Sequence, residues 1–110
     1  MKNDAIYLKH ILDAIEEVEN YLGKIGFADF EKNTLVINAT IRQLEIIGEA
    51  AMRISKEFKA KNSEIPWLEI IGMRNRLIHE YFGVDIKVVW ETVTNDLVKL
   101  KEILVKTIEE

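Results

Sequence analysis

Three polar side chains that could take part in a chemical reaction lie within residues 73–85, MRNRLIHEYFGVD, where the pattern of apolar residues predicts a helix. They are Arg74, Asn75 and His79. An arginine carries a planar, permanently charged fork that suits phosphate oxygens. A histidine titrates near neutral pH, so it can take or give a proton. An asparagine can orient that ring or donate to an oxyanion.

Together these residue types could cleave RNA without a metal ion. A base removes the proton of the 2′-hydroxyl, the oxygen attacks the adjacent phosphorus, and a cation stabilises the developing charge. In this scheme His79 is the base or proton shuttle, Arg74 the phosphate clamp and Asn75 the orienting group. The set lacks a general acid, which a second histidine from a dimer partner could supply.

On a helical wheel, Arg74 and Asn75 project from within the apolar sector, with His79 and Tyr81 at or near its edges. The solvated side is already occupied by Glu69, Met73, Arg76 and Glu80. Arg74 and His79 lie about 7.5 Å apart along the axis and diverge by about 140°, so they flank a groove. Because unpaired buried polar groups cost roughly 1–3 kcal/mol, we expect these to be paired or to line a wet cleft.

Four helices are expected to position these residues. The first runs from about Asp4, a plausible N-cap, to Leu22, and the second from Thr34 to Lys59. The third opens near Pro66 and stops at Gly83, and a fourth, capped by Asp85, continues nearly to the end of the sequence. Short connections between them predict one all-α domain over residues 1–110, an antiparallel four-helix bundle.

The expected second helix is apolar on more than one side, which indicates more than one neighbour. A second copy of the chain is one candidate for that neighbour. Gly48, Ala50 and Ala51, in the segment IIGEAA, would permit a close helix approach.

Composition excludes several classes of protein. No run of 18 apolar residues is present, so nothing is expected to span a membrane. The charged start MKNDAIYLKH and the absence of cysteine favour a cytoplasmic protein. The net charge of −4 argues against tight, sequence-blind coating of nucleic acid. Two histidines without ligand spacing predict no metal site, and we expect no cofactor.

The segment RNRLIHEY resembles the Arg-x4-His motif of the HEPN superfamily, extended by a tyrosine. The surrounding IPWLEIIGMRNRLIHEYFGVD and QLEIIGEAAMRIS resemble the HepT-like proteins, the toxin partners of MntA-type minimal nucleotidyltransferases. An Arg-x4-His pattern alone is weak. With the tyrosine, the Pro-Trp opening and the GEAA segment, the resemblance is specific and covers essentially the whole chain.

The resemblance implies an all-α homodimer in which the motifs of both chains line one cleft, with higher assembly possible. It implies a metal-independent endoribonuclease of a type VII toxin–antitoxin system, with RNA as substrate, Arg74 and His79 as the catalytic pair and Asn75 in support. It also implies that the nucleotidyltransferase partner silences the toxin by transferring AMP to Tyr81.

Other interpretations stay open. The chain could be a non-catalytic helical module that binds a nucleotidyltransferase and holds a nucleotide or substrate. Arg74 could instead form an ion pair with Glu45 or Glu49 across a dimer interface, and the polar groups could serve dimer specificity. Both tryptophans are expected in the core, and His10 at the bundle rim or in solvent.

Overall fold

A computed structural model describes residues 2–79 and 85–109, and the backbone alone at Lys2, Ile78, His79 and Glu109. The elements are α1 (Lys2–Leu22), α2 (Phe27–Lys32), α3 (Thr34–Arg53), α4 (Lys56–Lys61), α5 (Trp67–His79), α6 (Ile86–Glu91), the π-helical segment η2 (Thr92–Asp96) and α7 (Leu97–Glu109). This described part contains helices and no strand, which confirms the predicted all-α fold. None of its helices is long and apolar enough to cross a membrane.

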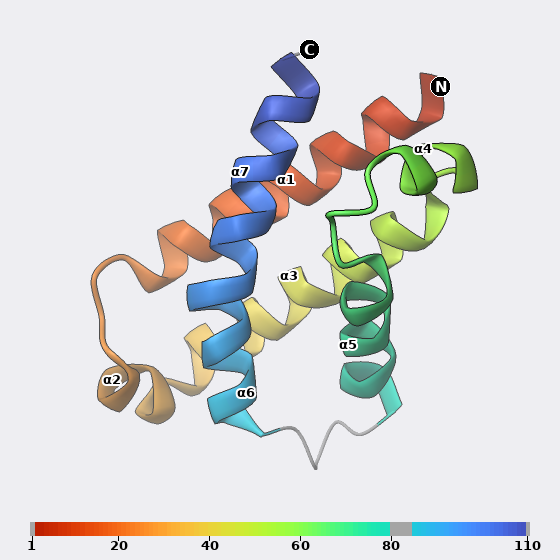
Figure 1. Cartoon of the computed structure of the whole chain (residues 1–110). Helices are drawn as coiled ribbons and strands as arrows, with labels where there is room; N and C mark the ends of the chain where they lie inside the picture. Colours follow the sequence, from red (N-terminus) through yellow and green to blue (C-terminus); the bar gives the residue numbers. More distant parts are fainter. Residues whose placement is uncertain (1, 80–84, 110) are drawn as a thin grey trace.

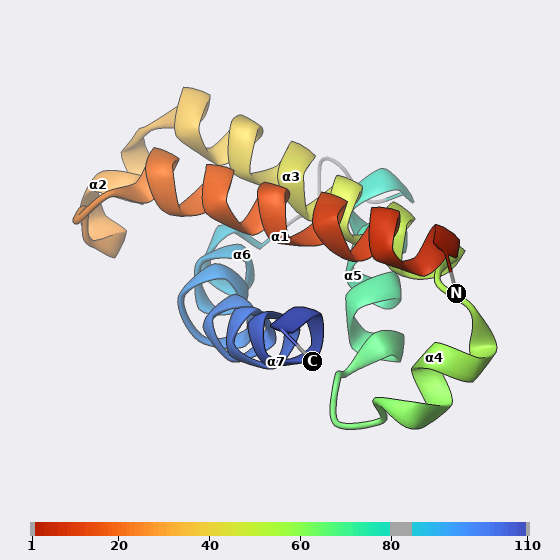
Figure 2. The ribbon, with the colours of Figure 1, turned by 90° about the horizontal axis from the view of Figure 1, so that it is seen from above.

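The helices form two layers (Figures 1 and 2). In the first layer α1 and α3 run antiparallel along each other. The second layer holds α5, which packs on α3, and the nearly continuous helix α6–η2–α7, which packs on α1. The four principal helices are those expected for the bundle.

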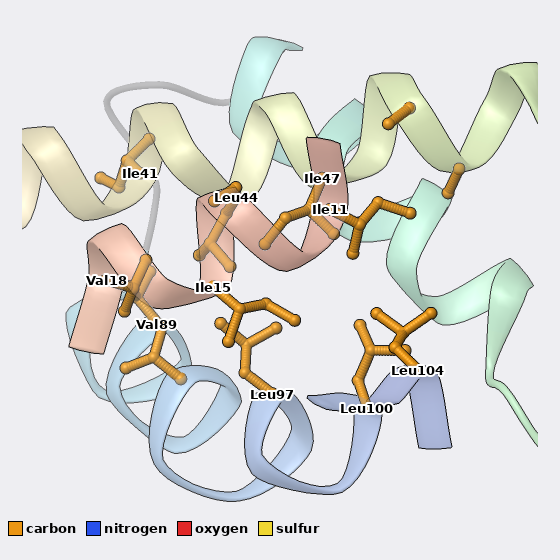
Figure 3. Close-up of a cluster of buried hydrophobic side chains, with 14 of the residues drawn as sticks. Ile11, Ile15, Val18, Ile41, Leu44, Ile47, Val89, Leu97, Leu100 and Leu104 are labelled. Carbon is orange, nitrogen blue, oxygen red and sulfur yellow. The ribbon is translucent and has the colours of Figure 1, made fainter. Parts of the chain in front are cut away.

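The core lies between these layers (Figure 3). Apolar residues at three- and four-residue steps place one stripe of each helix inward. The buried side chains that meet there are Ile11, Ile15, Val18, Ile41, Leu44, Ile47, Val89, Leu97, Leu100 and Leu104. The stripes of α1 and of α6–η2–α7 therefore face inward, although Ile108, at the end of α7, is 48% exposed.

Helix α3 has more than one neighbour, as its broad apolar surface predicted: it packs mainly on α1 and α5 of the same chain and also contacts α2. Ile41 and Ile47 face the core, while Gly48 and Ala51 are buried farther along the helix. Leu35, in the first turn of α3, is 79% exposed.

The second helix was predicted too long, because it ends at Arg53 and not at Lys59. Ser55 has extended backbone, and its hydroxyl accepts a hydrogen bond from the Phe58 N–H at 3.1 Å, which starts the separate helix α4. The Asp4 carboxylate accepts hydrogen bonds from the Ser55 N–H at 2.8 Å and its hydroxyl at 2.7 Å. Asp4 lies inside the first turn of α1 and binds this break, so its expected role as N-cap was wrong.

The fourth helix begins as predicted, with Asp85 accepting a hydrogen bond from the Lys87 N–H at 2.9 Å. Its middle differs from the prediction, since it widens into η2. There the hydroxyls of Thr92 and Thr94 donate to the carbonyls of Val88 and Trp90 at 2.8 and 2.7 Å. Such side-chain bonds to a carbonyl one turn back disturb the regular helical ladder. The predicted stop at Gly83 lies outside the described residues.

Candidate active site

Arg74 lies on α5 at the point where this helix meets α3 most closely. Gly48 of α3 faces it, and a Cβ atom built on Gly48 would come within 2.1 Å of the Arg74 Cβ and 2.7 Å of its Cγ. Glycine therefore lets the arginine stem lie directly on the backbone of α3. The predicted close approach at the IIGEAA segment is confirmed, and its partner is α5 of the same chain.

Arg74 is half-buried as a residue, and its guanidinium is hydrogen-bonded to its sequence neighbour. Nη1 donates to Oδ1 of Asn75 at 2.9 Å. The Nε atom is buried and has no hydrogen-bond partner in the part of the chain that the structure describes. Because arginine keeps its charge at all physiological pH values, the group presents a partly desolvated cation.

Glu45 and Glu49, the carboxylates considered as partners of Arg74, lie beside a different arginine of the chain. Arg42 Nη1 stands 3.4 Å from Oε1 of Glu45 and 3.9 Å from Oε1 of Glu49. Within residues 2–79 and 85–109, no carboxylate forms an ion pair with Arg74. Among the described residues of one chain, its charge is therefore not neutralised by a carboxylate.

Asn75 differs from its expected environment, because it is exposed and not within the apolar side of α5. The buried side of the helix is centred nearer Arg74 and Leu77, and Leu77 is only 1% exposed. Leu68, two turns before Asn75 on the same face, is 85% exposed. The apolar sector is therefore rotated away from Asn75, toward Leu77, and Asn75 stands on an open face.

His79 is the last residue of α5, so its backbone continues the helix that carries Arg74. Helical geometry therefore gives the two residues the expected axial offset of about 7.5 Å and divergence of about 140°. The side chain of His79, and all of Tyr81, lie outside the described residues. Their meeting with Arg74 in one groove stays a prediction.

A cleft of about 610 Å³ separates α5 from the helix α6–η2–α7, on the side of α5 opposite Asn75. Its apolar floor includes Leu44 and Ile47 of α3. Glu69 and Arg76 line its α5 wall and are exposed, as their assignment to the solvated face predicted. The sequence did not reveal this cleft, because it arises where the third and fourth helices fail to pack together.

The remaining candidates occupy structural positions, as expected. Trp67 is buried and its Nε1 donates to the Asn62 carbonyl at 3.1 Å. The Trp90 ring lies 5.1 Å from that of Phe30. His10 is exposed, with its ring edge-on to Tyr7. Across the described residues, no three His, Cys, Asp or Glu side chains gather as a metal site would need.

Comparison with known proteins supplies the context for this site. Residues 11–107 match the family described as ribonuclease HepT-like. The chain is 46% identical over 110 residues to "Putative RNase TTE0752" of Caldanaerobacter subterraneus subsp. tengcongensis, which covers 96% of this chain and 98% of that protein. It is 48% identical over 95 residues to "Probable ribonuclease HepT" of Thermococcus cleftensis, covering 86% of each.

A third relative is longer. "Gamma-glutamylcyclotransferase and putative RNase MJ0434" of Methanocaldococcus jannaschii is 45% identical over 109 residues, which is 99% of this chain and 49% of that protein. The chain thus spans about half of this relative. No solved structure matches the chain. The resemblance to HepT-like proteins noted from the motif is confirmed.

Proposed function

Because the chain belongs to the HepT-like ribonuclease family, we propose that it is a metal-independent endoribonuclease that uses Arg74 and His79. The observation that carries this proposal is the state of Arg74. The residue is half-buried with its Nε atom buried, its guanidinium is held by an uncharged neighbour, and it has no carboxylate partner among the described side chains. A cation kept in this way is suited to bind a phosphate and to stabilise the charge that develops on it.

The proposed reaction is transesterification within the RNA chain. His79 takes the proton of the 2′-hydroxyl, and the freed oxygen attacks the adjacent phosphorus. Arg74 stabilises the additional negative charge on the phosphoryl oxygens, and Asn75 orients the reacting groups. The bond to the 5′-oxygen breaks, that oxygen takes up a proton, and a 2′,3′-cyclic phosphate remains.

The proton for the leaving 5′-oxygen needs a general acid, and we assign it to His79 of a second copy. Arg74 and His79 point about 140° apart on one helix, so they flank a substrate and do not meet. A symmetric homodimer would bring the Arg74–His79 pair of the second copy to the groove that Arg74 and His79 of the first copy flank. The exposed face that carries Asn75 and Leu68 is available for such an approach.

Regulation would act on the groove flanked by Arg74 and His79. We propose that the chain is the toxin of a HepT/MntA-type toxin–antitoxin system and acts in the cytoplasm. Its partner, an MntA-type nucleotidyltransferase, would transfer AMP to Tyr81, which follows His79 by two residues. The added phosphate and adenosine would place negative charge and bulk where the RNA backbone must bind.

RNA cleavage in the presence of EDTA tests this function. Wild type should cleave, and His79→Ala should lower the rate by roughly 10²–10⁴-fold, the usual contribution of general acid–base catalysis. His10→Ala is a matched control, because it removes the only other histidine, an exposed one. Equal cleavage by wild type and His79→Ala would refute the assignment. Absence of cleavage by wild type, checked by mass to be free of AMP, would favour the non-catalytic partner-binding module.

A further inference from the structure

Gly48 is the one glycine, among those that the structure describes in detail, at which a side chain has no room. A Cβ atom there would lie 2.1 Å from the Arg74 Cβ, 2.7 Å from its Cγ and 3.3 Å from the Ile70 carbonyl oxygen. A Cβ at Gly26 would meet no atom within 4 Å. Gly48 lies inside α3 and has no unusual backbone angle to explain its choice.

The contact concerns the part of Arg74 that decides where its charge lies. Cβ and Cγ are the first atoms of the side chain, so a displacement there moves the whole guanidinium. Among the described residues, the guanidinium is held by one hydrogen bond, to Asn75, and its buried Nε has no partner. Packing of the stem against α3 therefore contributes much of what fixes the guanidinium.

We propose that Gly48 is a positioning residue for catalysis, because its missing side chain sets the place of the Arg74 guanidinium. This inference rests on the proposed function, in which Arg74 binds the scissile phosphate. A methyl group at position 48 forces the stem of Arg74 away from α3 and carries the charge with it. A displacement of about 1 Å in a catalytic group can lower a rate by as much as about 10²-fold.

The test compares Gly48→Ala with Gly26→Ala, the same substitution at the open position that precedes α2. Both are assayed at a temperature at which circular dichroism shows them fully folded. Gly48→Ala should lower kcat by at least about tenfold and change KM by less than about threefold, since the lost interaction acts in the transition state. Gly26→Ala should match wild type. A folded Gly48→Ala with wild-type kcat would overturn the proposal.

A double variant separates positioning from a general effect on the fold. In Arg74→Gly, which lacks both the guanidinium and the clashing Cβ, Gly48→Ala should lower the remaining cleavage no further, because the group that it displaces is gone. An equal fold-loss in both backgrounds would overturn the proposal. If Gly48→Ala does not fold, Gly48→Ala with Arg74→Gly, which removes the clashing Cβ, should fold. If this double variant also fails to fold, the contact between position 48 and Arg74 is not the cause of the misfolding, and the proposal is overturned.

A readout without RNA distinguishes this inference from the proposed function. The NMR resonance of the Arg74 Nε–H should shift in Gly48→Ala and stay in place in Gly26→Ala. An unchanged resonance would overturn the positioning role even if cleavage were lost. A shifted resonance in a protein whose wild type cleaves no RNA would confirm the contact, and would overturn both the proposed function and the catalytic role of Gly48.

Discussion

Arg74 donates a hydrogen bond from Nη1 to Oδ1 of Asn75 across 2.9 Å, so an uncharged amide holds the cation of the candidate site. An amide can orient a guanidinium without neutralising it. The two acidic residues that α3 could offer, Glu45 and Glu49, lie beside Arg42. Neither carboxylate pairs with Arg74 within the described chain, and in the proposed function the positive charge of Arg74 binds a phosphate.

Replacement of Asn75 should separate two effects on Arg74: the orientation of its guanidinium and the neutralisation of its charge. Asn75→Ala removes the acceptor, and cleavage should fall by about tenfold because the guanidinium loses one restraint. Asn75→Asp keeps an acceptor but adds a negative charge that pairs with Arg74 and repels the RNA phosphate, so cleavage should fall further. Since salt screens exposed charges, the gap between the variants should narrow as ionic strength rises. Rates for Asn75→Asp at or above those of Asn75→Ala at low salt would contradict this account.

The bond between Asp4 and Ser55 should contribute measurably to stability. The Asp4 carboxylate is buried and accepts two hydrogen bonds from Ser55, at the break between α3 and α4. Asp4→Asn should lower the free energy of unfolding by about 1.5–3 kcal/mol, the usual range for hydrogen bonds to a charged group. Asp13→Asn is the control, because Asp13 forms only an exposed pair with Lys9. Equal urea midpoints for Asp4→Asn and Asp13→Asn would contradict the prediction.

The same carboxylate predicts a dependence of stability on pH. Burial alone would raise the pKa of Asp4, but the hydrogen bonds from Ser55 favour the charged form, and the pKa lies below its ordinary value. Because the pKa is lower in the folded state, the stabilisation is complete above about pH 4 and is lost as pH falls through the folded pKa. Urea unfolding should therefore show the gap between wild type and Asp4→Asn shrinking in acid. If the difference in the free energy of unfolding between wild type and Asp4→Asn widened in acid, the prediction would be contradicted.

Tyr81 should be the site of inactivation by the proposed partner. Incubation with an MntA-type nucleotidyltransferase and ATP should add the mass of AMP to wild type and abolish its cleavage of RNA. Tyr81→Phe should remain unmodified and active after the same treatment. Tyr21→Phe is the control, since Tyr21 accepts a hydrogen bond from Gln43 at the far end of α1. Equal loss of activity in Tyr81→Phe would exclude Tyr81 as the target.

Much of the fold followed from spacing and from a few residues that start or stop helices. The stripe through Ile11, Ile15 and Val18 is buried, and Gly23, with φ of 52°, follows the end of α1. Such features are local, so the sequence alone is sufficient to find them. The break at Ser55 was missed because the Ser55 hydroxyl acts together with Asp4, which lies 51 residues away in the chain.

The site was predictable by residue type and less so by environment. Arg74 was identified from the sequence. Its packing against Gly48 was not, because that contact depends on which face of α5 meets α3. The helical wheel placed Asn75 inside, whereas the buried face is centred nearer Leu77. The cleft beside α5 depends on the tilt between helices, which no periodicity in one segment encodes.

Analysis of the cleavage products tests the central claim most directly. Wild-type protein should cut RNA in EDTA and leave 2′,3′-cyclic phosphate ends, because the 2′-oxygen is the nucleophile. An RNA with a single 2′-deoxy nucleotide on the 5′ side of the mapped cut should resist cleavage at that bond alone. Products that carry 3′-hydroxyl and 5′-phosphate ends, or normal cleavage at the deoxy position, would contradict the role proposed for His79 and Arg74.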